Sequence, residues 1–137
     1  MVSGPFLQFL CKNDICMVWS VLAELQTPPV VTTDFVYVRF IGNRSIQEND
    51  FDRIQIDRIA EMQKWANNIK NIQEDERIKL SIVAANNHYA GFGPGTANVF
   101  RSMLGLSEAR WENKVEEEQR EVVPTQEKQR TLSDFLS

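Results

Sequence analysis

The chain has 137 residues, of which 42% are hydrophobic and 25% are charged. This is a common domain size, and it allows one hydrophobic core to form without disulfide bonds. The formal net charge of -4 argues against a surface that holds nucleic acid directly. We therefore expect any contact with DNA to be local or to be made through a partner protein.

Cysteine content and hydropathy indicate where in the cell the protein is located. Cys11 and Cys16, with a single histidine in the chain, are too few ligands for a structural zinc site, and we expect both to be buried free thiols. The sequence shows no secretory leader, and no apolar run approaches the ~20 residues that a membrane span requires. These features predict a cytoplasmic protein that does not contact a membrane.

Two strands are predicted in the first third of the chain. The continuous apolar run Ile15–Trp19 is typical of a strand that is buried on both faces. After a break at Pro28 and Pro29, the β-branched and aromatic residues of Phe35–Phe40 predict the clearest strand of the sequence. Both patterns favour a parallel sheet.

A long helix and a third strand follow. Apolar residues recur at three- to five-residue steps over Phe51–Ile72, which predicts an amphipathic helix with Asn49 or Asp50 as its cap. The run Leu80–Ala85 then predicts another buried strand.

A glycine-rich turn precedes the last predicted helix. The turn covers Gly91–Gly95, and we expect Thr96 to cap the helix and Gly105 to end it. Free backbone N–H groups in such a turn can bind an anion, but no Gly-Lys-Ser/Thr follows, so a plain strand-to-helix turn is favoured.

This order of elements indicates an α/β fold in which helices cover a parallel sheet. From Glu108 onward the last 30 residues hold 8 acidic and 5 basic residues, which is typical of a charged tail, flexible or helical. We therefore divide the chain into a domain over 1–107, a charged tether over 108–128 and a terminal peptide over 129–137.

Several motifs occur together in a fixed order: Thr27-Pro28-Pro29, Thr33–Phe40 with Gly42, Trp65-Ala66, and Asn86-Asn87-His88 with Gly91 and Asn98. In this order they resemble the YecE-like family, also called domain of unknown function 72. The resemblance covers about residues 10 to 107 and implies a TIM-barrel-like fold of about 250 residues, of which this chain resembles only the C-terminal portion. Three strands cannot close a barrel. We therefore expect a partial TIM-barrel-like sheet, either a fragment of a longer protein or one that pairs its open edges with another copy.

The resemblance places candidate ligand-binding residues at the C-terminal ends of strands, where such barrels carry their chemistry. Arg39 can hold an anionic group by two hydrogen bonds, or it can pair with Asp34 instead. Asn86, Asn87 and His88 suit a polar ligand or a phosphate, or the asparagines only satisfy loop backbone. One histidine is too few for a catalytic zinc, so we expect no metal here, while the catalytic residues and any cofactor stay unknown.

The last residues carry a second pattern, formed by Gln129, Leu132, Phe135 and Leu136. This spacing resembles the PCNA-interacting peptide, in which a tight helical turn gathers the apolar side chains and the glutamine reaches a polar pocket. The alternative is that this apolar segment folds back onto the domain.

Two functions follow as hypotheses. In the first, the tail recruits the domain to PCNA, the DNA sliding clamp, for replication or repair. In the second, the chain is a TIM-barrel-type enzyme, a hydrolase or nuclease, that acts on a phosphate-bearing substrate. In either case we expect the uncovered strands to cause dimers, aggregates or a molten state when the chain is expressed alone.

Overall fold

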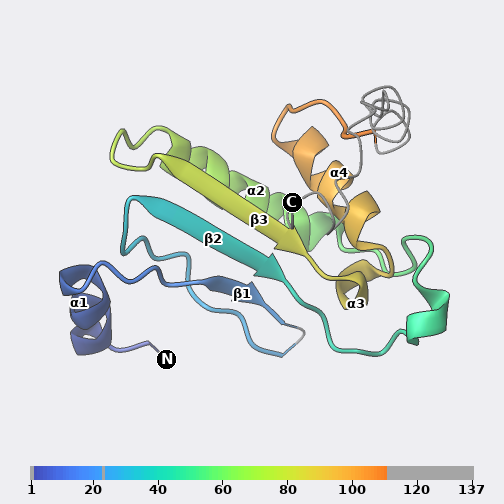
Figure 1. Ribbon diagram of the computed structural model, residues 1–137, viewed down its shortest axis with the longest axis horizontal. Coiled ribbons are helices and arrows are strands. Elements are labelled where there is room, and N and C mark those ends of the chain that lie inside the picture. The colour runs from blue at the N-terminus through green and yellow to red at the C-terminus, as the bar shows by residue number, and fades with distance from the viewer. Residues whose placement is uncertain (1, 23, 111–137) are drawn as a thin grey trace, which may run out of the picture.

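The structure, a computed structural model, describes residues 2–22 and 24–110. Its elements in chain order are α1 (Gly4–Lys12), β1 (Trp19–Val21), β2 (Phe35–Phe40), the 3-10 helix η1 (Glu48–Asp50), α2 (Ile59–Gln73), β3 (Leu80–Ala85), α3 (Asn87–Ala90) and α4 (Gly93–Met103) (Figure 1). The three strands form one parallel sheet in the order β1-β2-β3, which confirms the α/β class and the parallel sheet. Residues 111–128 of the predicted tether (108–128) and the whole terminal peptide (129–137) lie outside the described residues.

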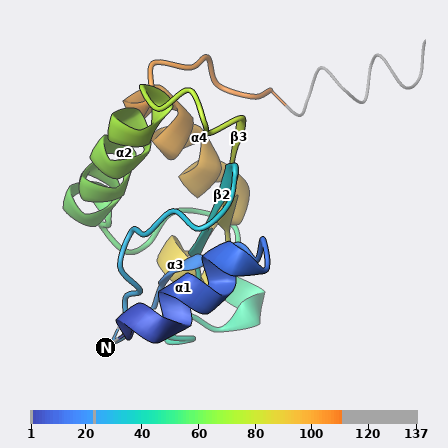
Figure 2. The ribbon, with the colours of Figure 1, turned by 90° about the vertical axis from the view of Figure 1, so that its left-hand side faces the viewer.

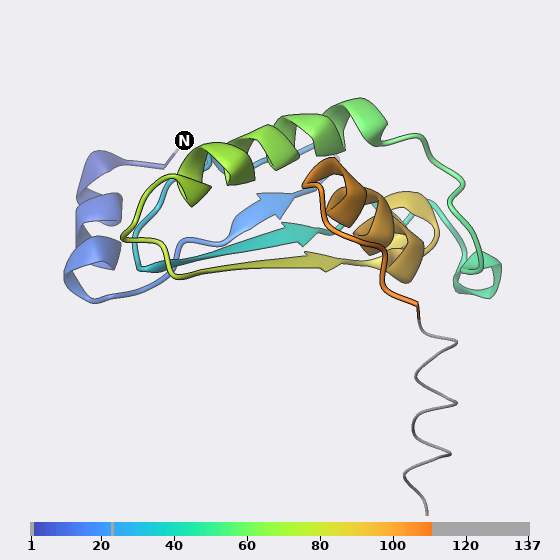
Figure 3. The same ribbon diagram turned by 90° about the horizontal axis from the view of Figure 1, so that it is seen from above.

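The two longer helices that follow the sheet strands, α2 and α4, lie on one face of the sheet (Figure 2 and Figure 3). Figure 2 looks along the sheet from the end where its strands begin and shows α2 and α4 on the same side of β2 and β3. Figure 3 shows the same arrangement from above, with no helix of the described part across the opposite face. The sheet therefore has a covered face and an open face.

Side chains alternate between these two faces along β2. Val36, Val38 and Phe40 point toward the helices and are at most 1% exposed, whereas Arg39 on the other face is exposed. The helix α2 contributes a buried stripe at helical spacing, formed by Met62, Trp65, Ala66 and Ile69. The core thus lies between the sheet and α2.

The bounds of β2 and β3 agree with the prediction, but β3 is not the buried strand that we predicted, because one face of it is open and Leu80 and Ile82 are exposed there. The bounds of the first strand were also predicted wrongly. We predicted it over Ile15–Trp19, and β1 is Trp19–Val21. The reason lies in Thr32, whose hydroxyl accepts a hydrogen bond from the Met17 N–H at 2.8 Å and donates one to the Ile15 carbonyl at 2.7 Å. A side chain therefore takes the place of a neighbouring strand at these residues.

The long helix also begins later than predicted. It starts at Ile59 rather than Phe51, and Asn49 and Asp50 lie in η1 instead of capping it. The intervening loop is held by another element, since the N–H groups of Gln55 and Ile56 both donate to the Ala90 carbonyl of α3. Tertiary hydrogen bonds therefore override the helical pattern of this segment.

The last helix begins three residues before the predicted cap. It starts at Gly93 with a proline in its first turn, and the Thr96 hydroxyl donates to the Phe92 carbonyl instead of capping. It ends near Gly105 as predicted, where φ is +74°. Helices α1 and α3 were not predicted. In the described part of the chain, no helix is long and apolar enough to cross a membrane.

The prediction of two buried thiols is wrong for Cys11, which is exposed on α1, while Cys16 is half-buried.

Candidate functional site

The C-terminal ends of β2 and β3 meet closely. The Asn86 N–H donates to the Phe40 carbonyl at 2.8 Å, so the chain leaving β3 stays beside the end of β2. After β2, Gly42 has φ +80°, and a Cβ on it would overlap the backbone carbonyl of His88. The loop after β2 therefore lies directly against α3, which only a glycine at this position permits.

Arg39 lies on the open face of the sheet, one residue before the end of β2. Its Cα is paired with Ser20 of β1 and Ala84 of β3, so the three residues form one row across the sheet. Among the described residues no hydrogen bond or ion pair involves the Arg39 side chain, and Asp34, its alternative partner in the sequence analysis, pairs with Lys79 at 2.8 Å. That pairing, first the hydrogen bond and then the charge of Lys79, lowers the pKa of Asp34. The guanidinium of Arg39 is available to a ligand.

Asn86 and Asn87 use their side-chain oxygens to hold the local backbone. Asn86 Oδ1 accepts a hydrogen bond from the His88 N–H at 3.0 Å and so caps α3. Asn87 Oδ1 accepts one from the Gly93 N–H at 2.7 Å and ties α3 to the start of α4. The structural role that the sequence left open for the asparagines is thus present in the fold.

His88 faces a different environment. Its ring meets Phe51 edge-on, with centroids 4.7 Å apart, and its Nδ1 is enclosed without a hydrogen-bond partner among the described residues. It also lines a cavity of about 410 Å³, together with residues of the loop after β2 and of η1: Arg44, Ile46, Gln47, Glu48 and Asn49. A histidine, an arginine and a carboxylate therefore line one cavity at the end of the sheet, a set that can bind a polar ligand.

The sequence did not indicate Arg44, Gln47 and Glu48 as site residues, because they lie several residues beyond the end of β2. A signal was present in Gly42-Asn43-Arg44, since a glycine followed by polar residues after a strand marks a tight turn. In the structure Arg44 itself has φ +58°, a conformation that is uncommon for residues other than glycine.

Behind the site, Tyr89 anchors α3 to α2. Its hydroxyl donates a 2.6 Å hydrogen bond to Glu61 Oε1, and Arg58 Nε donates a 3.0 Å hydrogen bond to the Tyr89 carbonyl. The Arg58 guanidinium also lies 5.1 Å from the centre of the Tyr89 ring. Burial, and then the hydrogen bond to Glu61, raise the pKa of Tyr89 well above its usual value. Tyr89 therefore holds a neutral phenol in the structure.

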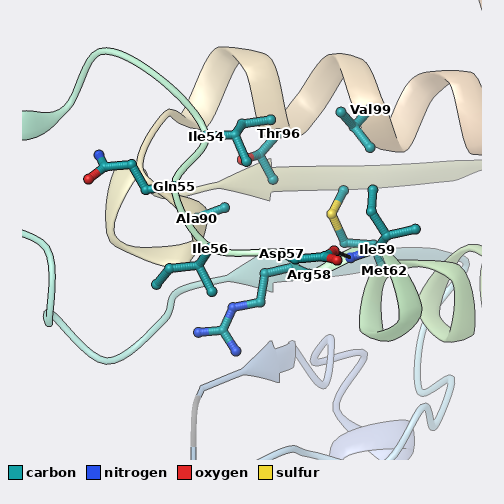
Figure 4. Close-up of a pocket in the computed structure, with 10 residues that line it drawn as sticks. All are labelled: Ile54, Gln55, Ile56, Asp57, Arg58, Ile59, Met62, Ala90, Thr96 and Val99. Atoms are coloured by element: carbon teal, nitrogen blue, oxygen red, sulfur yellow. Dashed lines mark hydrogen bonds between the residues drawn. The ribbon is translucent and has the colours of Figure 1, made fainter.

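A second cavity, of about 310 Å³, lies between the loop before α2, the start of α2, and α4. Figure 4 shows Val99 of α4 facing Met62 and Ile59 of α2, while the Arg58 side chain extends away from α4. The hydroxyl of Thr96 is already bonded to the Phe92 carbonyl at 2.8 Å. This cavity therefore suits an apolar group rather than a charged substrate. Within residues 2–22 and 24–110, no three His, Cys, Asp or Glu side chains are grouped to hold a metal ion.

Comparison with known proteins identifies the family. The family model described as "Protein of unknown function DUF72" matches residues 2–121, whereas no curated protein matches the chain. A solved DUF72 family protein from Thermotoga maritima is 24% identical with a TM-score of 0.57, and the match covers 75% of this chain and 42% of that one. Another, from Enterococcus faecalis, is 19% identical with a TM-score of 0.53, and covers 78% and 44%.

At these identities the two solved structures show a shared fold alone, and this chain spans less than half the length of either. The three described strands are a part of such a fold and do not form a closed barrel. The family that the sequence motifs indicated is confirmed by the match over 2–121. The chain belongs to the DUF72 family.

Proposed function

We propose that this DUF72 domain is recruited to the DNA sliding clamp PCNA by its last residues and acts there in DNA replication or repair. The observation that carries the proposal is the spacing of Gln129, Leu132, Phe135 and Leu136. These residues lie beyond the stretch 2–121 that the family model matches, so they are an addition to the family domain. They also lie outside the described residues.

The chemistry of the tail fits a groove-binding peptide. One tight helical turn would place Leu132, Phe135 and Leu136 on one side, where they enter an apolar pocket of the clamp. Lys128 and Arg130 would then meet an acidic rim, while Gln129 would fill a polar pocket. Anchoring by a few apolar side chains in this way is typical of peptides that bind with micromolar affinity.

The charge of the chain supports recruitment over direct DNA binding. The formal net charge is -4, and nonspecific DNA binding depends on lysines and arginines that neutralise phosphates. A protein of this charge reaches DNA more readily through a ring that already encircles it.

Calorimetric titration of a peptide spanning 124–137 into PCNA of the same organism tests the proposal. We expect micromolar binding that Phe135→Ala abolishes and that Ser137→Ala, the matched control, leaves within about twofold. Flat heats with the unchanged peptide would contradict the proposal.

The alternative hypothesis, a hydrolase or nuclease that acts on a phosphate-bearing substrate, stays a hypothesis. Arg39, Asn86, Asn87 and His88 remain its candidate ligand-binding residues, but no observation in the described part specifically favours it over other polar ligands.

A further inference from the structure

The two outer edges of the sheet differ in how their backbone groups are satisfied. At the outer edge of β1, the Thr27 hydroxyl accepts a hydrogen bond from the Ser20 N–H at 2.8 Å and donates one to the Val18 carbonyl at 3.0 Å. The Thr27 N–H donates to the Ser20 carbonyl at 3.2 Å. Thr32 satisfies the preceding residues in the same way. The edge of β1 is therefore closed by the chain's own threonines.

The outer edge of β3 has no such cover. Asn86 donates its N–H to Phe40 of β2, so by the alternation of a parallel ladder the backbone groups of Ser81, Val83 and Ala85 point away from β2. No strand of the described part lies beyond β3, and none of its hydrogen bonds uses these outward groups. Figure 3 looks toward this edge and shows it without a neighbouring strand. Of the two sheet edges that the sequence led us to expect as open, the edge of β3 is the one left unpaired within residues 2–22 and 24–110.

A mainly apolar cavity lies beside the edge of β3. A cavity of about 310 Å³ runs between the edge of β3 and α4, and Val83, Phe100 and Leu106 are among its mainly apolar lining residues. On the open face of the same strand, Leu80 and Ile82 are 54% and 42% exposed. Unpaired backbone next to exposed apolar side chains is the pattern that favours pairing with another strand.

We propose that β3 pairs with β3 of a second copy of this chain, antiparallel and across a two-fold axis, to form a dimer with a continuous six-stranded sheet. The strand is suited to pairing with itself because Leu80–Ala85 contains no charge and no proline, so no like charges come to lie opposite each other. Lys79, just before the strand, is already paired with Asp34.

The closed edge of β1 explains why assembly stops at two copies. Each copy offers one unpaired edge, and an isologous contact uses that edge on both copies at once. Two open edges would instead allow head-to-tail growth into larger aggregates. Leu80 and Ile82 stay on the open face of the six-stranded sheet, where side chains of the partner copy then lie beside them and cover part of their apolar surface.

Sedimentation of the full chain over a range of micromolar concentrations tests this inference. We expect a reversible monomer–dimer equilibrium. Ile82→Lys places two ammonium groups near the two-fold axis and should weaken dimerisation at least tenfold, without loss of the folded near-ultraviolet dichroism. Leu25→Lys is the matched control, since Leu25 is 64% exposed and lies beside β1, and it should leave the equilibrium unchanged.

Hydrogen exchange separates edge pairing from other contacts. The outward N–H of Val83 should gain protection as concentration rises, and Ile82→Lys should remove that gain. A monomer at all concentrations, a dimer unaffected by Ile82→Lys, or a monomer in which Val83 is already protected by the chain's own tail would each overturn the proposal.

Discussion

The two oxygens of the Glu61 carboxylate join two distant parts of the chain, since Oε1 accepts a 2.6 Å hydrogen bond from the Tyr89 hydroxyl and Oε2 accepts a 2.7 Å one from Gln26 Nε2. Glu61 belongs to α2, Tyr89 to α3, and Gln26 to the loop that covers the edge of β1. The position of α3, and with it that of His88, thus depends on this carboxylate.

Replacing Tyr89 by phenylalanine should lower the free energy of unfolding by about 1–3 kcal/mol, because it leaves a partly buried carboxylate oxygen without its donor. Chemical denaturation measures the change. Tyr37→Phe is the control, since Tyr37 lies on the open face and its hydroxyl makes no hydrogen bond within the described part. An equal effect of the two substitutions would contradict the role assigned to the Glu61 contact.

Alkaline pH should destabilise the fold by ionising the Tyr89 hydroxyl. Burial and the Glu61 hydrogen bond raise the pKa of Tyr89 above the ordinary value of 10.0. Its contribution to stability is therefore fully present below about pH 10 and is lost as pH rises toward the folded-state pKa. Phenolate absorbance should show Tyr89 ionising only as dichroism reports unfolding. Reversible ionisation of both tyrosines in the folded protein would rule this out.

Three glycine substitutions separate steric overlap from backbone strain. Gly42→Ala combines φ +80° with overlap on the His88 carbonyl, and we expect a loss of roughly 3 kcal/mol or more. Gly105→Ala has only the conformational penalty, at φ +74° with open space around it, and should cost about 1–2 kcal/mol. Gly4→Ala has neither and should change stability by less than about 1 kcal/mol. Any other order in denaturation experiments would show that the loop after β2 is not held against α3.

The candidate ligand site can be tested with inorganic phosphate as the probe. In NMR titrations we expect the signals of Arg44 and His88, which line the same cavity, to shift most, and Arg44→Ala to weaken binding by about tenfold through loss of charge-assisted hydrogen bonds. Arg77→Ala serves as a control, because Arg77 is exposed and paired with Asp75 at 2.7 Å, away from the end of the sheet. Equal effects of the two substitutions would mean that phosphate only samples surface charge.

The sequence predicted the bounds of β2 and β3 because apolar and β-branched runs bounded by polar residues signal strands directly. It did not predict that one face of these strands is open, since what covers a face depends on where the helices pack. It could not predict β1, because the hydrogen bonds of Thr32 displace a neighbouring strand from Met17 and Ile15. The start of α2 could not be predicted either, because the loop before α2 is held by hydrogen bonds to Ala90. Only the folded chain brings Ala90 next to this loop.

Only part of the residues at the candidate site could be singled out from the sequence. His88 and the asparagines were located because they follow a strand, and strand position can be read from sequence. Arg44 and Glu48 join His88 only through the close contact between Gly42 and α3, which is a tertiary contact without a local pattern.

Recruitment to the clamp is tested most directly by titrating the full chain into PCNA and comparing it with the Phe135→Ala and Ile82→Lys variants. We expect the full chain to bind PCNA with micromolar affinity and the Phe135→Ala variant not to bind. The affinity of each tail for PCNA should be unchanged by Ile82→Lys, which alters only β3. Binding that survives Phe135→Ala, or no binding by the full chain, would contradict recruitment by the tail.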